Sequence, residues 1–304
     1  MKLAAPLSPT EVLSQVALAL PESARASAII IGSLAAGYHF FSGDGAAAIR
    51  TKDVDCLLAP NAKVVAAAVH VTEQLLSANW KQRQDGKWGA PGATELALEA
   101  LPMVRLQPPG GSEWFLELLA APPEYVAGQP DKKLARVHTS AGDFAICSFD
   151  FLALAEWKPL TTQLGVRIAR PEMMALSNLL HHPVIGETLM AGTDYKRANK
   201  DLGCVLALAH LTIARDRKDG TDELSAWPLR MWEALQLKFG DHAKPLAQRA
   251  GSGVNALMAS AFDLQQALRI ANTGLLSSMD VSVDAILATG RRLQVDVMEP
   301  LADS

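Results

Sequence analysis

Two carboxylates lie two residues apart in Asp53-Val54-Asp55, which opens an apolar run that continues through Cys56-Leu57-Leu58. Side chains of a strand alternate between its faces, so Asp53 and Asp55 would point to the same face, about 7 Å apart. Two carboxylates on one face of an apolar strand are costly unless a positive group pairs with them. A divalent cation does this well, and Mg²⁺ prefers carboxylate and phosphate oxygens. The spacing therefore predicts a magnesium site on a strand over residues 53–58.

A glycine-serine pair, Gly32-Ser33, follows the short apolar run Ala28-Ile29-Ile30-Ile31 and precedes a helical stretch from Leu34 to Phe40. Glycine lets the backbone approach a ligand closely, and the start of a helix attracts phosphate. Serine is also a common helix cap, so Ser33 has a structural alternative. Together with the acidic pair, this turn would form one site for a triphosphate and its metal ions.

Glu117 is the candidate third carboxylate, because it lies in the middle of the apolar segment Phe115-Leu116-Glu117-Leu118-Leu119. A charged side chain at such a position is unusual unless it has a partner. A third acidic residue would complete a two-metal site with Asp53 and Asp55. The alternative is that Glu117 pairs with Arg105 on a neighbouring strand.

The elements that must position these residues are strands mixed with helices up to about residue 170. Besides 28–31 and 53–58, we expect strands at 80–84, 103–107, 114–119, 137–139, 144–148 and 166–169, and helices at 9–20 and 62–78. From Pro171 the pattern is almost entirely helical, with helices at 172–182, 195–215 and 223–239 and shorter ones to the end. This order indicates an α+β domain over residues 1–169 followed by an α-helical domain over residues 170–304.

The composition excludes several classes of protein. With 304 residues, 49% hydrophobic and 20% charged, the chain is neither disordered nor collagen-like. Its three cysteines are far apart and form no CxxC pair, which disfavours a disulfide framework and a cysteine zinc site. We expect a cytoplasmic protein without a membrane span or secretory signal. A net charge of −4 disfavours nucleic-acid binding through global charge, although a local basic patch stays open.

The glycine-serine turn, the Asp-x-Asp strand and a later carboxylate together resemble the nucleotidyltransferase superfamily related to DNA polymerase β. More narrowly, Arg50-Thr51-Lys52-Asp53-Val54-Asp55 resembles the Arg-x-Thr-x-Asp-hydrophobic-Asp motif of bacterial nucleotidyltransferase-fold proteins similar to abortive-infection toxins. The helix led by Pro171 and the later helix with Lys196, Lys200 and Asp201 extend the match. The resemblance covers about residues 25–210.

The resemblance implies a nucleotidyltransferase-like mixed sheet flanked by helices and an enzyme that transfers a nucleoside monophosphate from an NTP to a hydroxyl acceptor. Asp53, Asp55 and Glu117 would bind two Mg²⁺ (or Mn²⁺) ions. One ion would lower the pKa of the attacking hydroxyl, and the other, with Gly32 and Ser33, would stabilise the leaving pyrophosphate. Lys196, Lys200 and Asp201 would contact the nucleotide.

Alternatives stay open at the sequence level. The acceptor is RNA, a protein or a small molecule, and a protein partner or a homo-oligomer is compatible with the helical region. Asn178 stands where relatives often carry a lysine that faces the phosphates. This departure favours a second interpretation, a catalytically weakened module that binds a nucleotide or a partner. A third is a helical scaffold beside a vestigial N-terminal fold.

Overall fold

The computed structural model describes residues 5–43, 48–83, 90–127, 129 and 132–304. The chain divides into two units. We call them the sheet unit (Ala4–Tyr38 and Thr51–Ala169) and the helical unit (His39–Arg50 and Arg170–Ser304), and both names refer to the described residues in these ranges. The segment 39–50 thus joins the helical unit, whereas the sequence analysis places it in the first domain. Arg50 N–H donates to the Gly274 carbonyl (3.3 Å) and the Ser277 hydroxyl to the Ala48 carbonyl (3.3 Å), which explains this assignment.

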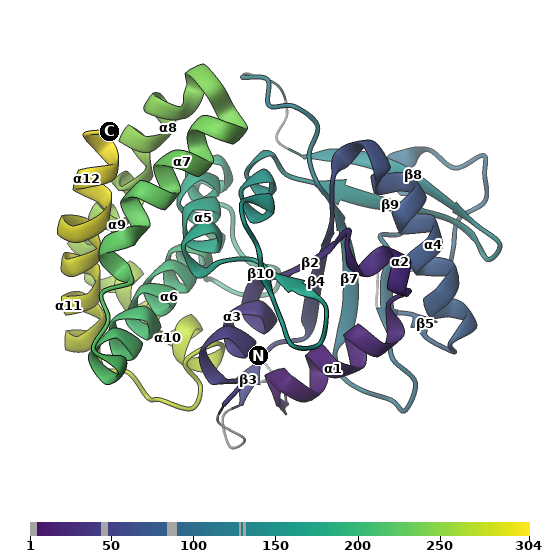
Figure 1. Cartoon of the computed structure of the whole chain (residues 1–304), viewed down its shortest axis with the longest axis horizontal. Coiled ribbons are helices and arrows are strands. Elements are labelled where there is room, and N and C mark those ends of the chain that lie inside the picture. Colours follow the sequence, from purple (N-terminus) through teal and green to yellow (C-terminus); the bar gives the residue numbers. More distant parts are fainter. Residues whose placement is uncertain (1–4, 44–47, 84–89, 128, 130–131) are drawn as a thin grey trace. The chain divides into compact units, whose positions relative to one another are not determined.

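Within the described residues, the sheet unit contains a nine-stranded mixed sheet (Figure 1). The strand order is β10 (Leu160–Thr161), β11 (Arg167–Ile168), β2 (Ala28–Ile31), β4 (Asp53–Leu58), β7 (Phe115–Ala120), β6 (Arg105–Gln107) and β5 (Lys81–Gln82). Strand β9 (Gly142–Ser148) pairs with both β7 and β8 (Lys133–Thr139). The pairs β4–β7, β7–β9 and β11–β2 are parallel, and the remaining pairs of this sheet are antiparallel. The fold class is therefore α+β, with a mixed sheet flanked by helices.

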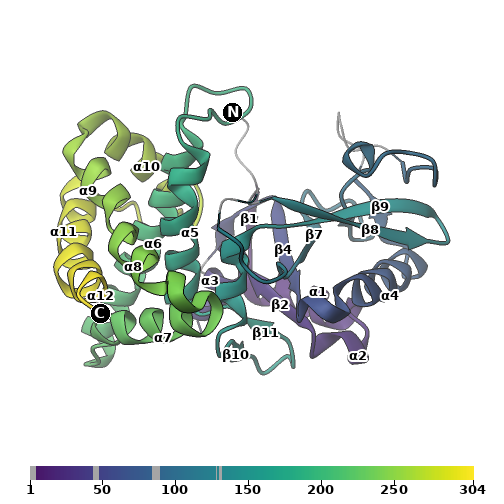
Figure 2. The same cartoon turned by 90° about the horizontal axis from the view of Figure 1, so that it is seen from above.

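Helices of the sheet unit begin where the sequence supplies caps and turns. Helix α1 (Pro9–Ala19) has Ser8 as its N-cap, whose hydroxyl accepts from Glu11 N–H (3.3 Å), and Pro9 at its first turn. Helix α2 (Glu22–Arg25) contacts β2 and α4 (Val64–Ser77), and α4 lies against β8 and β4 (Figure 2). Helix α3 (Gly32–Phe41) follows β2 without an intervening loop. Strands β1 (Pro6–Leu7) and β3 (Ile49–Arg50) have two residues each.

The helical unit is built around α5 (Pro171–Ile185) and α6 (Arg197–Asp219), which contact one another extensively (Figure 1). Gly203 of α6 lets α10 (Ala261–Thr273) approach closely, because a Cβ there would lie 2.7 Å from the Ala267 carbonyl oxygen. The remaining helices are α7 (Trp227–Phe239), α8 (Ala243–Ala250), α9 (Ser252–Ala259), α11 (Val283–Leu293) and α12 (Glu299–Ala302). None of the helices in the described part of the chain is long and apolar enough to cross a membrane.

The predicted elements match the structure to different degrees. Strands at 28–31 and 53–58 have the predicted bounds. Strand β8 begins at Lys133, four residues before the predicted start. The predicted helix at 223–239 instead begins as a 3₁₀ turn at Leu224–Ala226, and α7 starts at Trp227, with Pro228 in its first turn where a missing N–H is tolerated. The end of the predicted strand at 80–84 lies outside the described residues.

Candidate functional site

Parallel pairing of β4 and β7 brings the predicted carboxylates to one face of the sheet. Asp55 lies opposite Glu117 in the register, and Asp53 lies opposite Phe115. Paired strands are about 4.8 Å apart, and alternating side chains keep Asp53, Asp55 and Glu117 on a common face, which we call the acidic face. Asp53 and Asp55 are both half-buried. The Thr51 hydroxyl donates to Asp53 Oδ1 (2.9 Å) and so restrains this carboxylate.

The turn at Gly32 touches the acidic face. Ile31, the last residue of β2, is the register partner of Asp55, so Gly32 begins α3 directly beside Asp55. Gly32 has φ = +68°, a backbone conformation that favours glycine, and a Cβ built on it would lie 2.9 Å from Asp55 Oδ2. The turn therefore requires glycine both for its backbone and for the space that the Asp55 carboxylate occupies. Ser33, half-buried, is the second residue of α3.

Glu117 has a basic partner on the neighbouring strand. Arg105 on β6 is its register partner, and Arg105 Nη2 lies 2.9 Å from Glu117 Oε1. Glu117 is only 8% exposed, so this ion pair is largely shielded from water. The Arg105 guanidinium also lies 5.6 Å from the centroid of the Phe115 ring, and that of Arg83 lies 4.2 Å from the same ring. The alternative partner that the sequence offered for Glu117 is thus present in the structure.

The residues present fit a divalent cation in part. Asp53 and Asp55 offer the hard oxygen donors that Mg²⁺ and Mn²⁺ prefer, and they share one face beside the Gly32 turn. Among the described residues, however, no group of three or more His, Cys, Asp or Glu side chains is arranged to hold a metal ion. Glu117 instead has Arg105 as an ion-pair partner. A site for one cation on the acidic pair is consistent with these contacts.

Two thiols lie in the strands around the acidic face. Cys147 on β9 is the register partner of Leu119, so it shares the face of Glu117. Burial raises the pKa of the Cys147 thiol to about 11, and the charge of Glu117 adds to this rise. Burial and, to a lesser degree, Asp55 raise the pKa of Cys56 to about 12. Both thiols are therefore neutral near pH 7, and neither is suited to act as a nucleophile.

The predicted nucleotide contacts Lys196, Lys200 and Asp201 belong to the helical unit, at the start of α6. Lys196 Nζ lies 3.0 Å from Glu187 Oε2 and 3.3 Å from Asp263 Oδ1. Asp201 Oδ2 lies 3.3 Å from His181 Nδ1, and Lys200 is exposed. Their contact with a nucleotide stays a prediction.

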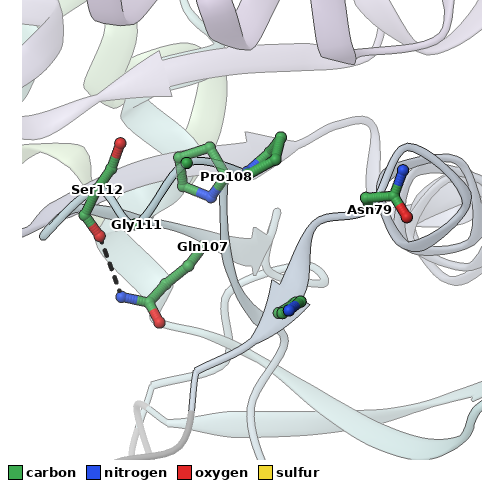
Figure 3. A pocket seen from close by; sticks show the side chains of 8 residues that line it. Asn79, Gln107, Pro108, Gly111 and Ser112 are labelled. Atoms are coloured by element: carbon green, nitrogen blue, oxygen red, sulfur yellow. Dashed lines mark hydrogen bonds between the residues drawn. The ribbon is translucent and has the colours of Figure 1, made fainter.

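A hollow of about 560 Å³ lies at the hairpin between β6 and β7 (Figure 3). The loop Pro108-Pro109-Gly110-Gly111 forms one wall, and the Gln107 side-chain amide donates to the Ser112 carbonyl (3.3 Å). Asn79 and Lys81 complete the lining. Gln107 follows Arg105 by two residues on β6, so the hollow lies near the end of the sheet where β7 begins and Asp53 stands.

Cys147 and Arg83 were missed by the sequence analysis as neighbours of this face. Their own segments carry no motif, and only the pairing of β9 with β7 and the packing of Arg83 on Phe115 place them there. Comparisons with family models, curated proteins and solved structures found no match for this chain. The functional assignment therefore depends on the geometry of the acidic face and on the sequence resemblance.

Proposed function

We propose that the chain is a metal-dependent nucleotidyltransferase with a nucleotidyltransferase fold, which transfers a nucleoside monophosphate from an NTP to a hydroxyl acceptor. The observation that carries the proposal is the contact of the Asp55 carboxylate with the Gly32 turn, with Asp53 on the same face. An acidic pair beside a glycine that starts a helix combines cation ligands with a phosphate-binding backbone.

Each part of the acidic face has a role in this proposal. A divalent cation held by Asp53 and Asp55 would supply positive charge to the leaving pyrophosphate and lower the pKa of the acceptor hydroxyl. The backbone N–H groups at the start of α3, from Gly32 and Ser33, would bind phosphate oxygens. Thr51 would hold Asp53 in position through its hydroxyl. The acceptor class, a cytoplasmic location and a toxin-like role belong to the proposal through the sequence resemblance alone.

A second candidate is a nucleotide-binding module without turnover. The Arg105–Glu117 ion pair favours it, because a carboxylate held by arginine is withdrawn from metal binding. The two candidates share NTP binding and differ in the release of pyrophosphate.

The test is a transfer assay with each of the four α-³²P-labelled NTPs and Mg²⁺, with total RNA or total protein as the acceptor mixture. We expect the double variant Asp53→Asn/Asp55→Asn to lose at least about 100-fold in labelled product, since even outer-shell partners of a metal site contribute about 10–100-fold. The matched control is Glu113→Gln, an exposed acid two residues before β7. Full activity in the double variant would overturn the proposal. NTP binding by the wild type without pyrophosphate release would favour the second candidate.

A further inference from the structure

We propose that the acidic face takes a single divalent cation, on Asp53 and Asp55, and that the Arg105 guanidinium stands in place of a second one, with Glu117 as its positioning residue. The inference rests on the proposed function and specifies how its site would hold a triphosphate. It replaces the predicted metal-ligand role of Glu117 with an ion pair that the structure contains.

The first argument is the ion pair between Glu117 and Arg105. The Glu117 Oε1 to Arg105 Nη2 distance is 2.9 Å, and the two side chains are 10% and 19% exposed. Their opposite positions in the β6–β7 register hold the pair together through the backbone. If Glu117 turned to a metal ion, the largely buried Arg105 guanidinium would lose its contact with Glu117, and breaking a buried pair in this way is strongly destabilising.

The second argument is that the Arg105 guanidinium is also fixed by an aromatic ring. Its central carbon lies 5.6 Å from the centroid of Phe115, the residue opposite Asp53 in the β4–β7 register. Attraction between a guanidinium and a ring extends to about 6 Å. The ion pair and the ring together hold a cationic group over β7, which lies between β6 and β4, the strand of Asp53 and Asp55.

The third argument is charge. Asp53, Asp55, Glu117 and Arg105 together carry two net negative charges when all are ionised, which one divalent cation balances. A second divalent ion would compete for space with the guanidinium that Glu117 already holds. Arginine suits this task, because its planar fork binds phosphate oxygens through two parallel hydrogen bonds. We therefore expect Arg105 to contact a phosphate of the NTP above the acidic face, beside Glu117.

The test uses electron paramagnetic resonance of Mn²⁺ bound to the full chain, alone and with a non-hydrolysable α,β-methylene NTP. Two Mn²⁺ ions at about 3.5–4 Å, the usual two-metal distance, would give an exchange-coupled spectrum. We expect instead the six-line spectrum of a single uncoupled ion. Glu117→Gln should change the Mn²⁺ dissociation constant by less than about 3-fold, whereas Asp55→Asn should raise it by at least about 10-fold.

The outcomes separate this inference from the proposed function. A coupled spectrum in the wild type, or an equal loss of Mn²⁺ affinity in Glu117→Gln and Asp55→Asn, would overturn the inference and leave the proposed function standing. Unchanged Mn²⁺ affinity in Asp55→Asn would count against both. Glu113→Gln serves as the acidic control, and thermal melts establish that each variant is folded.

Arg105→Gln gives a complementary result, since it removes the guanidinium that Glu117 contacts. We expect this variant to take up a second Mn²⁺ and to weaken binding of the NTP analogue. Should Arg105→Gln fail to fold, Arg105→Gln/Glu117→Gln removes both charges together, and this double variant should keep the single-ion spectrum while losing analogue affinity. Unchanged analogue affinity in a folded Arg105 variant would contradict the role assigned to Arg105.

Discussion

Acidic side chains are buried in both units, but their surroundings differ. In the helical unit, Asp216 near the end of α6 accepts hydrogen bonds from the backbone N–H groups of Glu223 (2.9 Å) and Leu224 (3.1 Å) and from the Thr221 hydroxyl (2.7 Å). These donors come from the turn that follows α6, so Asp216 organises that turn. The donors of Asp216 named here all come from the protein itself.

Glu172 of α5 is likewise buried and paired with protein groups. Its Oε1 lies 3.4 Å from Arg230 and 3.7 Å from Arg170, and burial raises the pKa of its carboxyl group above the usual value. In the sheet unit, by contrast, the Asp55 carboxylate lies against a turn that tolerates no Cβ. The comparison separates acids whose protein donors stabilise a turn or a helix from an acidic pair beside a glycine turn, for which we propose an external cation.

The largest effect is expected from filling the space beside Asp55. Gly32→Ala adds a Cβ at 2.9 Å from Asp55 Oδ2 and should reduce NTP transfer and Mn²⁺ affinity at least about 10-fold, because the carboxylate must move. Gly220→Ala is the matched control, with φ = +70° and open space around the new Cβ. Both variants should lose about 1–2 kcal/mol of unfolding free energy from the left-handed backbone. Equal transfer activity in the two variants would show that the contact with Asp55 is not needed.

Removing the structural acid of the helical unit should act on stability instead. Asp216→Ala leaves two backbone N–H groups and one hydroxyl without their acceptor, so we expect a loss of about 3 kcal/mol in chemical denaturation. The exposed neighbour Asp219→Ala should change the unfolding free energy by less than about 0.5 kcal/mol. Mn²⁺ affinity should be unchanged in the folded Asp216→Ala protein. A loss of Mn²⁺ binding in folded Asp216→Ala would contradict the structural role assigned to Asp216.

A half-buried histidine in the helical unit gives a pH-dependent effect. Burial, with the charges of Arg215 and Arg170, lowers the pKa of His39 to about 4, and Arg215 Nη1 lies 2.8 Å from its Nε2. The unfolded chain protonates this ring below pH 6.5, so its stabilisation is complete above that pH and is lost as the pH falls towards 4. We expect this loss to be about 2 kcal/mol, because the ring is only half-buried and solvent screens part of the shift.

The measurement is the unfolding free energy of the wild type and His39→Gln between pH 7 and pH 4.5. Glutamine can still accept from Arg215 and does not titrate. The wild type should therefore lose more stability than the variant over this interval, and parallel curves would refute the assignment.

The smallest effect is expected at Lys196. Its ammonium is held by Glu187 and Asp263, and these hydrogen bonds raise the pKa of Lys196. Because these carboxylates already occupy it, Lys196→Gln should change the dissociation constant for an NTP analogue by less than about 3-fold, within the range of an exposed ion pair. Isothermal titration calorimetry measures this directly, with Lys200→Gln as the companion variant. A rise of 10-fold or more in the dissociation constant of Lys196→Gln for the NTP analogue would support the nucleotide contact expected from the sequence.

The parts of the fold that depend on local pattern could be predicted from the sequence. The β-branched run at 28–31 and the alternation at 53–58 give the bounds of β2 and β4, and the Ser8-Pro9 cap gives the start of α1. The common face of Asp53 and Asp55 follows from the same alternation. These features need only neighbouring residues, which is why one sequence is enough.

Other features depend on contacts between distant residues. Arg105 was only one alternative for Glu117, because a single sequence does not give the register of β6 and β7. The contact between Asp55 and Gly32 follows from the antiparallel pairing of β2 with β4, and the place of Cys147 follows from the pairing of β9 with β7. Segment 39–50 joins the helical unit through bonds to residues more than 200 positions away.

The most direct test of the acidic pair is thermal unfolding with and without Mg²⁺ and each of the four NTPs. A ligand at about 100 times its dissociation constant stabilises the folded state by about 2.7 kcal/mol, which raises the melting temperature by a few degrees. We predict that at least one NTP with Mg²⁺ stabilises the wild type and Glu113→Gln but not Asp53→Asn/Asp55→Asn. Equal stabilisation of the double variant, or none of the wild type by any NTP, would contradict the account.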